Sequence, residues 1–310
     1  MSKTVILVTG SNGQIGTELV SALQKKHGQD SVIATDLKDN ENSEGIFEFL
    51  DVMNFERVER VIKKYNVTQI YHLAALLSSS GEKNPALTWR INLDAYLNIL
   101  QLAHKHKIEK IFFPSTIGVF GPTTPRINTP QNTSFVPGTV YGISKITGEL
   151  WSQYYRNTYG LDIRGIRFPG VISYATIPKG GTTDFAVEIF FEAVKNKKYD
   201  CFLKADTRLP MVYMPDVLKA TLDLMEAPKE DISISYAYNI SGFSLTPAEL
   251  NVAIKKYIPE LQITYTPDKR QKIADSWSET IDDSLARKDW NWSPAYDMES
   301  MVKDMLDNIK

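Results

Sequence analysis

The sequence predicts an α/β protein in which a doubly wound parallel sheet is joined by a smaller C-terminal lobe. In the first half, short apolar runs suited to strands buried on both faces alternate with segments whose apolar residues recur at helical spacing. Right-handed crossovers between such strands give a parallel sheet with helices on both faces. The alternation breaks after residue 168, and this break indicates the smaller lobe.

The elements of the first half follow one another in a regular rhythm. A first strand is predicted at 4–8, just before Gly10. The helix after it gathers Ile15, Leu19 and Leu23 on one face and ends near Gly28. Asn84 followed by Pro85 starts a longer helix, because the asparagine side chain caps the first helical turn and proline fits the backbone of that turn. The remaining strands are predicted at 32–35, 46–50, 69–73, 110–113 and 162–168, and helices around 55–62, from 84 to about 107 and at 140–159.

The second half is less regular. Residues 170–183 are rich in glycine, threonine and proline, which is typical of a loop. A helix near 184–195, a strand near 211–214 and a helix from 215 to about 225 follow. Helical pieces are predicted between 246 and 310, around the run Trp290-Asn291-Trp292.

A glycine turn joins the first strand to the first helix. Gly10, Gly13 and Gly16 allow a tight bend, a close approach of the backbone to a pyrophosphate, and close packing of helix on strand. The helix N-terminus adds free N–H groups and a partial positive charge. Asp36 ends the second strand about twenty residues beyond Gly16, where a carboxylate binds ribose hydroxyls and repels a 2′-phosphate. The turn therefore predicts a nucleotide site that prefers NAD over NADP.

Further cofactor contacts are predicted at the carboxyl ends of the strands, where open α/β sheets bind ligands. Asp51 and Val52 follow the third strand and could lie beside the adenine. The small residues of Leu73-Ala74-Ala75 would let the cofactor approach the backbone at the end of the fourth strand. The predicted cofactor set also includes Gln14, Ile15, Asn92, Tyr141, Lys145, Phe168, Gly170 and Val171.

Tyr141 and Lys145 are spaced i and i+4 on the predicted helix, so they share one face. A free tyrosine has a pKa near ~10 and is a poor base at neutral pH. A neighbouring ammonium favours the phenolate, which can accept a proton from an alcohol as hydride leaves its carbon. Ser115 and Thr116, in Pro114-Ser115-Thr116 after the fifth strand, offer a hydroxyl for the substrate oxygen, and either could hold it.

Composition excludes several other classes of function. Lysine and arginine total 35 against 37 acidic residues, so a net charge of −2 argues against nucleic acid or an anionic membrane as partner. Cys201 is the single cysteine, and the four histidines form no ligand pattern, so no metal site is expected. Neither a signal-peptide pattern nor an apolar run near the ~18 residues of a membrane span is present. We expect a cytoplasmic protein.

As a set, these motifs resemble the extended branch of the short-chain dehydrogenase/reductase family. The marks are the glycine turn, Asp36, His72-Leu73-Ala74-Ala75, Pro114-Ser115-Thr116 and Tyr141-x-x-x-Lys145. The resemblance implies a Rossmann dinucleotide-binding sheet with a small C-terminal substrate lobe. Since strands of that family shuttle between lobes, we expect residues 1–171 plus about 211–240 in the NAD-binding domain. The substrate lobe would then take about 172–210 and 241–310.

Within that branch, the chain is similar to the zinc-independent L-threonine 3-dehydrogenases. The segments that carry this likeness are 167–173, 180–187, 273–277, 281–284 and 289–290. The resemblance implies NAD-dependent oxidation of the Cβ hydroxyl of L-threonine to 2-amino-3-ketobutyrate. Tyr141 would be the base, Lys145 would orient the ribose and lower the tyrosine pKa, and Thr116 or Ser115 would hold the hydroxyl. It also implies a homodimer, and a 2-amino-3-ketobutyrate CoA ligase as downstream partner.

A zwitterionic substrate needs donors for its carboxylate and an acceptor for its ammonium. The loop at 180–183 offers N–H groups and the hydroxyls of Thr182 and Thr183, and Trp277 could form a wall. Ser78, Ser79 and Ser80 offer more hydroxyls, and the sequence leaves open which of them faces the substrate. No arginine stands out as a clamp for the carboxylate.

The alternative is a nucleotide-sugar epimerase or dehydratase on the same scaffold. Such epimerases usually carry an asparagine after the sixth strand, where this chain has Pro169. The dehydratases follow their active-site threonine with acidic residues, where this chain has Ile117 and Gly118. Both differences favour the threonine dehydrogenase.

Overall fold

The computed structural model describes residues 3–39, 44–177 and 180–309. Its centre is a seven-stranded sheet of order β10-β6-β5-β4-β1-β2-β3, in which every neighbouring pair is parallel. The predicted doubly wound parallel sheet is therefore confirmed. Its strands are β1 (Ile6–Thr9), β2 (Val32–Asp36), β3 (Ile46–Phe49), β4 (Gln69–His72), β5 (Lys110–Thr116), β6 (Asp162–Phe168) and β10 (Tyr238–Asn239).

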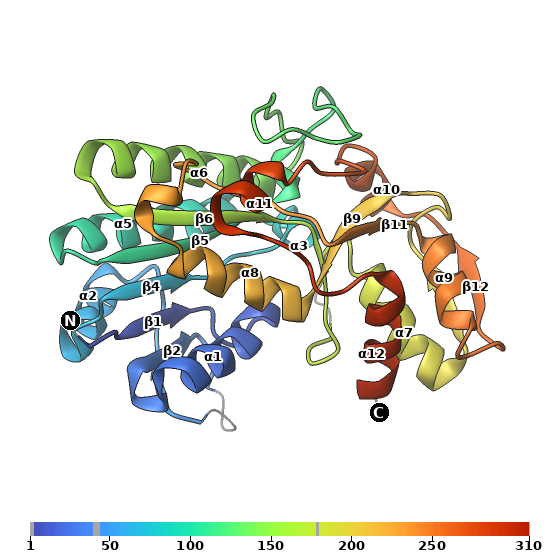
Figure 1. Cartoon of the computed structure of the whole chain (residues 1–310), viewed down its shortest axis with the longest axis horizontal. Helices are drawn as coiled ribbons and strands as arrows, with labels where there is room; N and C mark the ends of the chain where they lie inside the picture. The colour runs from blue at the N-terminus through green and yellow to red at the C-terminus, as the bar shows by residue number, and fades with distance from the viewer. Residues whose placement is uncertain (1–2, 40–43, 178–179, 310) are drawn as a thin grey trace.

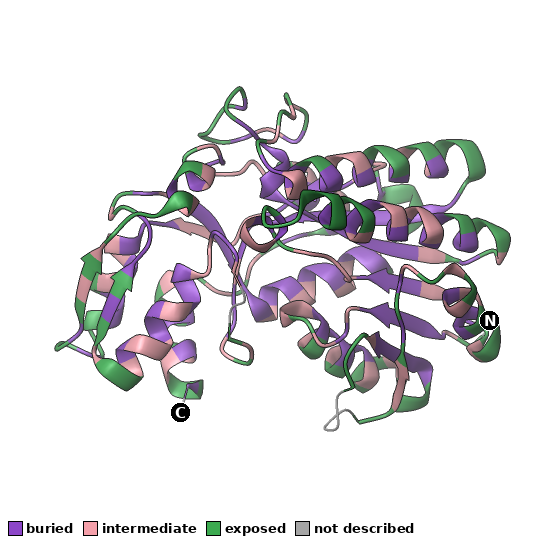
Figure 2. Ribbon diagram, turned by 180° about the vertical axis from the view of Figure 1, so that it is seen from behind, coloured by how far each residue is buried: buried purple, intermediate pink, exposed green. Residues whose placement is uncertain are grey.

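Helices cover both faces of this sheet (Figure 1). Alternate residues of a strand point to opposite faces, so Ile6 and Val8 join one hydrophobic core and Leu7 joins another. Both cores are buried, as the purple strands of Figure 2 show. The first core includes α1 (Gln14–His27) and α8 (Met214–Glu226), and the second includes α2 (Phe55–Tyr65), α5 (Ala95–Lys105) and α6 (Val140–Tyr159).

A smaller lobe lies beyond the carboxyl ends of the strands, with a third hydrophobic core of its own (Figure 1). Two small sheets build it, one of order β11-β9-β7 and the other a β12–β8 pair. The strands are β7 (Gly170–Ile172), β8 (Lys198–Cys201), β9 (Leu209–Tyr213), β11 (Phe243–Leu245) and β12 (Gln262–Tyr265). The helices are α7 (Phe185–Asn196), α9 (Pro247–Lys255), α10 (Lys269–Ala274) and α12 (Met298–Asn308).

The chain near its end returns to the large sheet through α11 (Ser284–Trp290). Trp290 stacks edge-on against Tyr238 of β10, and the Trp292 indole donates to Asp283. The predicted run around Trp290 is thus part of the core beside the sheet. The remaining short elements are α3 (Ser78–Gly81), α4 (Pro85–Trp89), η1 (Gln29–Ser31), η2 (Arg90–Asp94), η3 (Ile117–Val119) and η4 (Lys229–Asp231).

Strand β5 is longer than the sequence predicts, and this is a correction. Residues 114–116 belong to the strand instead of following it, because they pair with the last three residues of β6. Proline is tolerated there because the ladder to β4 ends at Phe112, so its missing N–H breaks no pairing on that side. The extension places Ser115 and Thr116 at fixed positions on the sheet.

The predicted helix from 84 to about 107 is present as α4, one π-helical stretch (η2) and α5. Asn84 caps it as predicted, because its side chain accepts a hydrogen bond from the Leu87 N–H. The pattern missed β7, β8, β10, β11 and β12. They contain two to four residues each, too few for an alternating signal.

No helix in the described part of the chain is both long enough and apolar enough to cross a lipid bilayer.

Candidate active site

The glycine turn lies where the strand order of the large sheet reverses, between β1 and β4. Ligands of open α/β sheets bind in the crevice at such a point. Gly10 has φ of +70°, and a Cβ there would lie 2.6 Å from the Ala74 nitrogen. A Cβ on Gly16 would collide with the Gly10 carbonyl. The turn therefore accepts only glycine at both positions, and it leaves the start of α1 open for an anionic group.

Two connected cavities form one cleft along this edge of the sheet. The outer cavity measures about 440 Å³ and the inner cavity about 510 Å³. They meet at Gly10, Gly13, Leu73, Ala75 and Leu76, which line both. An elongated cleft that crosses the glycine turn fits a dinucleotide, with its pyrophosphate at the turn.

The predicted cofactor residues divide between the two cavities. Asp36, Asp51, Val52 and Ala74 line the outer one. The Asp36 carboxylate is fixed at its edge by the N–H groups of Asn12 (3.0 Å) and Leu37 (2.7 Å). This arrangement suits the adenosine ribose. The inner cavity is lined by Gln14, Ile15, Gly16, Tyr141, Lys145, Phe168, Gly170 and Val171.

Asn92 lies in the π-helical stretch and lines neither cavity. Its side chain accepts from the Leu76 N–H (2.8 Å) and donates to the Leu76 carbonyl (3.0 Å) and the Ser144 hydroxyl (3.2 Å). Leu76 lines both cavities, so Asn92 supports the wall of the cleft from behind.

Tyr141, Lys145 and Thr116 meet in the inner cavity. Helix α6 presents the tyrosine and the lysine one turn apart, and Thr116 at the end of β5 hydrogen-bonds the Tyr141 side chain. The Lys145 Nζ lies 5.9 Å from the centre of the Tyr141 ring and donates to the Pro114 carbonyl at 2.8 Å. A phenol, an amine and a hydroxyl are thus brought together.

Burial opposes the charged form of both Tyr141 and Lys145. It raises the pKa of Tyr141 to about 12, although the hydrogen bond with Thr116 acts the other way. It lowers the pKa of Lys145 to about 7, although the nearby Glu149 carboxylate acts the other way. The sequence predicts a lowered tyrosine pKa. For the protein without cofactor that prediction is wrong, because desolvation outweighs the hydrogen bond with Thr116.

The structure separates the two hydroxyls that the sequence left as alternatives. Ser115 lines the cavity but its hydroxyl donates to Glu149, beneath the site. Thr116 has its hydroxyl beside Tyr141, where it also accepts from the Gly118 N–H at 3.0 Å. Side chains alternate along a strand, so only one of two consecutive hydroxyls faces the tyrosine.

Several predicted substrate residues line the inner cavity. Ser78 and Thr182 lie 3.3 Å apart, hydroxyl to hydroxyl. Thr183, Trp277 and Ser80 line the same cavity, whereas Ser79 lines neither.

Asp184 is a residue that the sequence reasoning missed. It lines the inner cavity at the start of α7, and its carboxylate accepts from the N–H groups of Gly180 (2.8 Å) and Gly181 (2.6 Å). Burial raises its pKa above the ordinary range. The only sequence signal was its place directly after the loop at 180–183.

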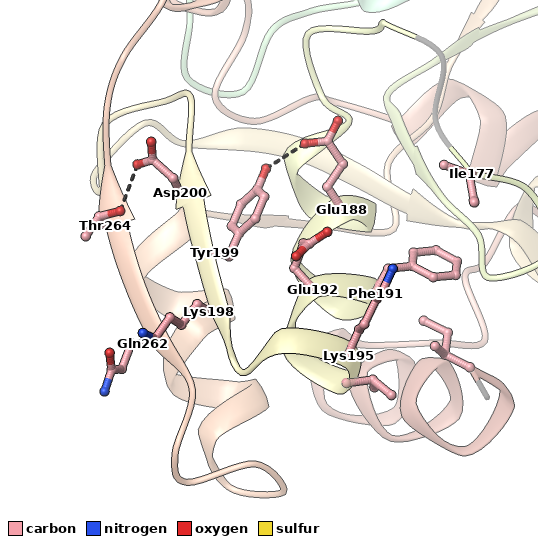
Figure 3. Close-up of a pocket in the computed structure, with 12 residues that line it drawn as sticks. Ile177, Glu188, Phe191, Glu192, Lys195, Lys198, Tyr199, Asp200, Gln262 and Thr264 are labelled. Atoms are coloured by element: carbon pink, nitrogen blue, oxygen red, sulfur yellow. Dashed lines mark hydrogen bonds between the residues drawn. The ribbon is translucent and has the colours of Figure 1, made fainter.

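A larger hollow of about 950 Å³ lies between α7 and the β8–β12 pair (Figure 3). Its polar groups partner one another: Tyr199 donates to Glu188 at 2.9 Å, and Thr264 donates to Asp200 at 2.8 Å. None of the predicted site residues lines it. Among residues 3–39, 44–177 and 180–309, no three histidine, cysteine or acidic side chains group as metal ligands would.

The fold and the cleft define an NAD-dependent enzyme of the extended dehydrogenase type. The NAD dependent epimerase/dehydratase family matches residues 6–241, and the chain belongs to that family. NAD is its cofactor.

Individual relatives narrow the comparison. Mitochondrial L-threonine 3-dehydrogenase of Bos taurus is 46% identical over 305 residues, which span 97% of this chain and 81% of that protein. The holo form of a GalE-like L-threonine dehydrogenase from Cupriavidus necator is 47% identical, with a TM-score of 0.97 and 99% and 100% of the two chains covered. A monomeric L-threonine 3-dehydrogenase from a metagenome is also 47% identical, with a TM-score of 0.96 and 98% of each chain covered. The resemblance to the L-threonine 3-dehydrogenases is confirmed.

Proposed function

We propose that this protein oxidises the Cβ hydroxyl of L-threonine to a ketone, which gives 2-amino-3-ketobutyrate. The observation that carries the proposal is the pairing of Thr116 with Tyr141 inside a cavity that is also lined by the polar side chains of Ser78, Thr182 and Asp184. Relatives named for this activity match nearly the whole chain. NAD, when bound in the cleft, supplies the acceptor for the hydride that leaves Cβ.

Tyr141 acts as the general base. Its phenolate takes the proton of the substrate hydroxyl while the C–H electron pair leaves Cβ, so that a C=O bond forms. Thr116 donates a hydrogen bond to the substrate oxygen and stabilises the negative charge that develops there. Lys145 supplies the positive charge that offsets the raised pKa of Tyr141, and the Pro114 carbonyl holds its ammonium in place.

Asp184 accepts a hydrogen bond from the substrate ammonium, and the hydroxyls of Ser78 and Thr182 donate to the substrate carboxylate. The Gly180 and Gly181 N–H groups already orient the Asp184 carboxylate at the cavity wall. Asp184→Asn is expected to raise KM for L-threonine about tenfold or more, with KM for NAD unchanged. Asp200→Asn, which changes a carboxylate outside the cleft, is the matched control. An unchanged KM for threonine would remove Asp184 from substrate binding.

The proposed function is tested by the appearance of reduced nicotinamide with a panel of substrates. L-threonine, D-threonine, L-serine and L-allo-threonine are each mixed with the protein and NAD, and UDP-galactose is examined separately for epimerised product. We expect reduction with L-threonine. Reduction with none of the amino acids, together with epimerisation of the sugar, would overturn the assignment and leave the cofactor site intact.

We also propose a homodimer that pairs through α4 and α6. These helices pack together and carry exposed apolar side chains, among them Leu87, Ile143, Leu150 and Tyr154. Positions 143, 150 and 154 share one face of α6, which indicates a surface for another protein. This face lies on the same helix that carries Tyr141, and we propose that a second copy of the chain covers it.

The division of the chain remains a proposal as well: residues 1–171 with about 211–240 bind NAD, and about 172–210 with 241–310 form the substrate lobe. A cytoplasmic location and a 2-amino-3-ketobutyrate CoA ligase that consumes the product complete the proposed function. Cell fractionation and a coupled assay with that ligase test these two points.

A further inference from the structure

Three consecutive residues of β5 contact three residues of α6 that lie one turn apart. The Pro114 carbonyl accepts from Lys145 (2.8 Å), and the Ser115 hydroxyl donates to Glu149. Thr116 hydrogen-bonds Tyr141. The Ser115–Glu149 pair is not needed by the proposed reaction, because Glu149 touches neither cavity.

Glu149 is an unusual residue to find in this position, because only 1% of its surface is exposed. Arg167 of β6, which is fully buried, binds its carboxylate through two nitrogens, with Nη2 at 2.7 Å and Nε at 3.0 Å. The Arg167 guanidinium also donates to the Gln131 carbonyl and the Asn239 side chain. A buried ion pair is weak evidence for stability, since well-packed apolar residues often serve as well. A role in the charge of the site is the better explanation.

The charged and titratable groups that face Lys145 come from three elements. Tyr141 and Glu149 lie on α6, Arg167 lies behind Glu149 on β6, and His72 ends β4. Burial lowers the pKa of His72 to about 3, so that ring is neutral. The attraction of Glu149 favours the charged form of Lys145, and loss of this carboxylate would leave the buried Arg167 guanidinium uncompensated, which disfavours a second positive charge on the lysine.

We propose that Glu149 is a positioning residue whose buried negative charge favours the protonated form of Lys145 at neutral pH, so that the lysine can stabilise the Tyr141 phenolate. This inference rests on the proposed function, since it assigns a role within the same site. Burial, the attraction of Glu149 and the 4.8 Å approach of Nζ to the Phe113 ring together set the charge of Lys145. Arg167 and Ser115 hold the carboxylate where it acts.

The test is the pH profile of kcat in the Glu149→Gln variant. Loss of the carboxylate lets Lys145 become neutral, so the pKa of Tyr141 rises. The acid limb of the profile, where kcat falls as the pH is lowered, therefore moves to higher pH. We expect a shift of about one pH unit, which is about a tenfold loss of kcat at pH 7. A limb at the wild-type position, or one moved to lower pH, would show that Lys145 stays charged without Glu149 and would overturn the proposal.

A matched control separates this effect from the damage caused by breaking any buried ion pair. Asp162 pairs with the buried Arg164 at 2.8 Å on the same strand as Arg167, at the end away from the cleft. Asp162→Asn is expected to lower thermal stability and to leave the limb in place. If Glu149→Gln does not fold, the double variant Glu149→Gln/Arg167→Met removes both charges, and the limb is again expected at higher pH.

A second readout does not depend on turnover. Tyrosinate absorbance of the NAD complex, taken as the difference from the same protein with Tyr141→Phe, reports the ionisation of Tyr141. We expect this titration to move to higher pH in Glu149→Gln. If the wild type oxidises no threonine but the titration still moves, the proposed function fails and the role of Glu149 stands. A titration that does not move contradicts that role.

Discussion

Tyr141 has an environment that works against the chemistry we assign to it. Burial raises its pKa to about 12, and the same burial lowers the pKa of its partner Lys145 to about 7. Both shifts favour the neutral pair over phenolate and ammonium. In the proposed mechanism, the attraction of Glu149 already supports the charge of Lys145, and the charge of the bound cofactor tips the balance toward the ionised pair. We therefore expect the reactive state to form only when the cofactor is bound.

Removal of the Tyr141 hydroxyl tests the base directly. Tyr141→Phe is expected to lower kcat by roughly 10²–10⁴ because the substrate proton has no acceptor, with NAD affinity largely kept. Steady-state rates and NAD binding measured by fluorescence are the readouts. Turnover close to wild type would exclude Tyr141 from proton transfer.

Asp36 is expected to set the choice of cofactor. Its carboxylate lines the outer cavity, where it would repel the 2′-phosphate of NADP. Asp36→Asn is expected to reduce the ratio of kcat/KM for NAD over NADP by about tenfold or more. Asp30→Asn, on η1 outside both cavities, serves as the control. Equal use of both cofactors by the wild type would contradict this role.

The contact between β5 and α6 decides the geometry of the site at the level of elements. The sequence predicts α6 with the bounds that the structure shows, because Thr139 caps its start and Gly160 ends it in a left-handed conformation. The helix can approach the end of β5 closely because Gly142 packs on the Gly118 backbone. That close approach brings Tyr141 to Thr116.

A methyl group at Gly142 tests this packing. Its Cβ would collide with the Gly118 carbonyl, so the start of α6 must move and take Tyr141 with it. We expect Gly142→Ala to lower kcat about 10²-fold while the fold is kept, because small misplacements of reacting groups are costly. Gly138→Ala is the control, since a Cβ there meets nothing within 4 Å. Wild-type turnover in Gly142→Ala would show that the approach is not critical.

The sequence predicts the large sheet well and the smaller lobe poorly. Strands such as β1 and β2 begin with continuous apolar runs that need no tertiary information. The four strands β7, β8, β11 and β12 contain three or four residues each and depend on partners far away in the chain.

The same limit applies within the site. Tyr141, Lys145 and the glycine turn follow from spacing along one helix or one turn. The choice between Ser115 and Thr116 depends on which of the two hydroxyls lies beside Tyr141 and which beside Glu149. Asp184 is recognised only when α7 has been placed beside the cleft. Side-chain direction across elements is a tertiary property, and spacing along the chain does not contain it.

At the scale of the whole molecule, three hydrophobic cores account for the two faces of the large sheet and the smaller lobe. The exposed apolar side chains on α4 and α6 lie outside these cores. Burial of such side chains against a second copy removes apolar surface from water, at about 25 cal/mol for each Å². These exposed side chains therefore support the proposed dimer.

Sedimentation velocity at micromolar concentration tests the dimer. We expect the wild type to sediment as a dimer and Leu150→Glu to sediment as a folded monomer, since a charge in that apolar face is costly to bury. Val252→Glu changes an equally exposed apolar residue on α9 and is expected to stay dimeric. A monomeric wild type would refute the proposal.

The most direct test of the proposed reaction follows the hydrogen on Cβ. L-Threonine that carries deuterium on Cβ is incubated with the protein and NAD, and the reduced cofactor is analysed by mass spectrometry. The account predicts one deuterium in each molecule of NADH, formed roughly 10²–10⁴ times more slowly with Tyr141→Phe. NADH without deuterium, or no NADH at all, would contradict hydride transfer from Cβ of threonine.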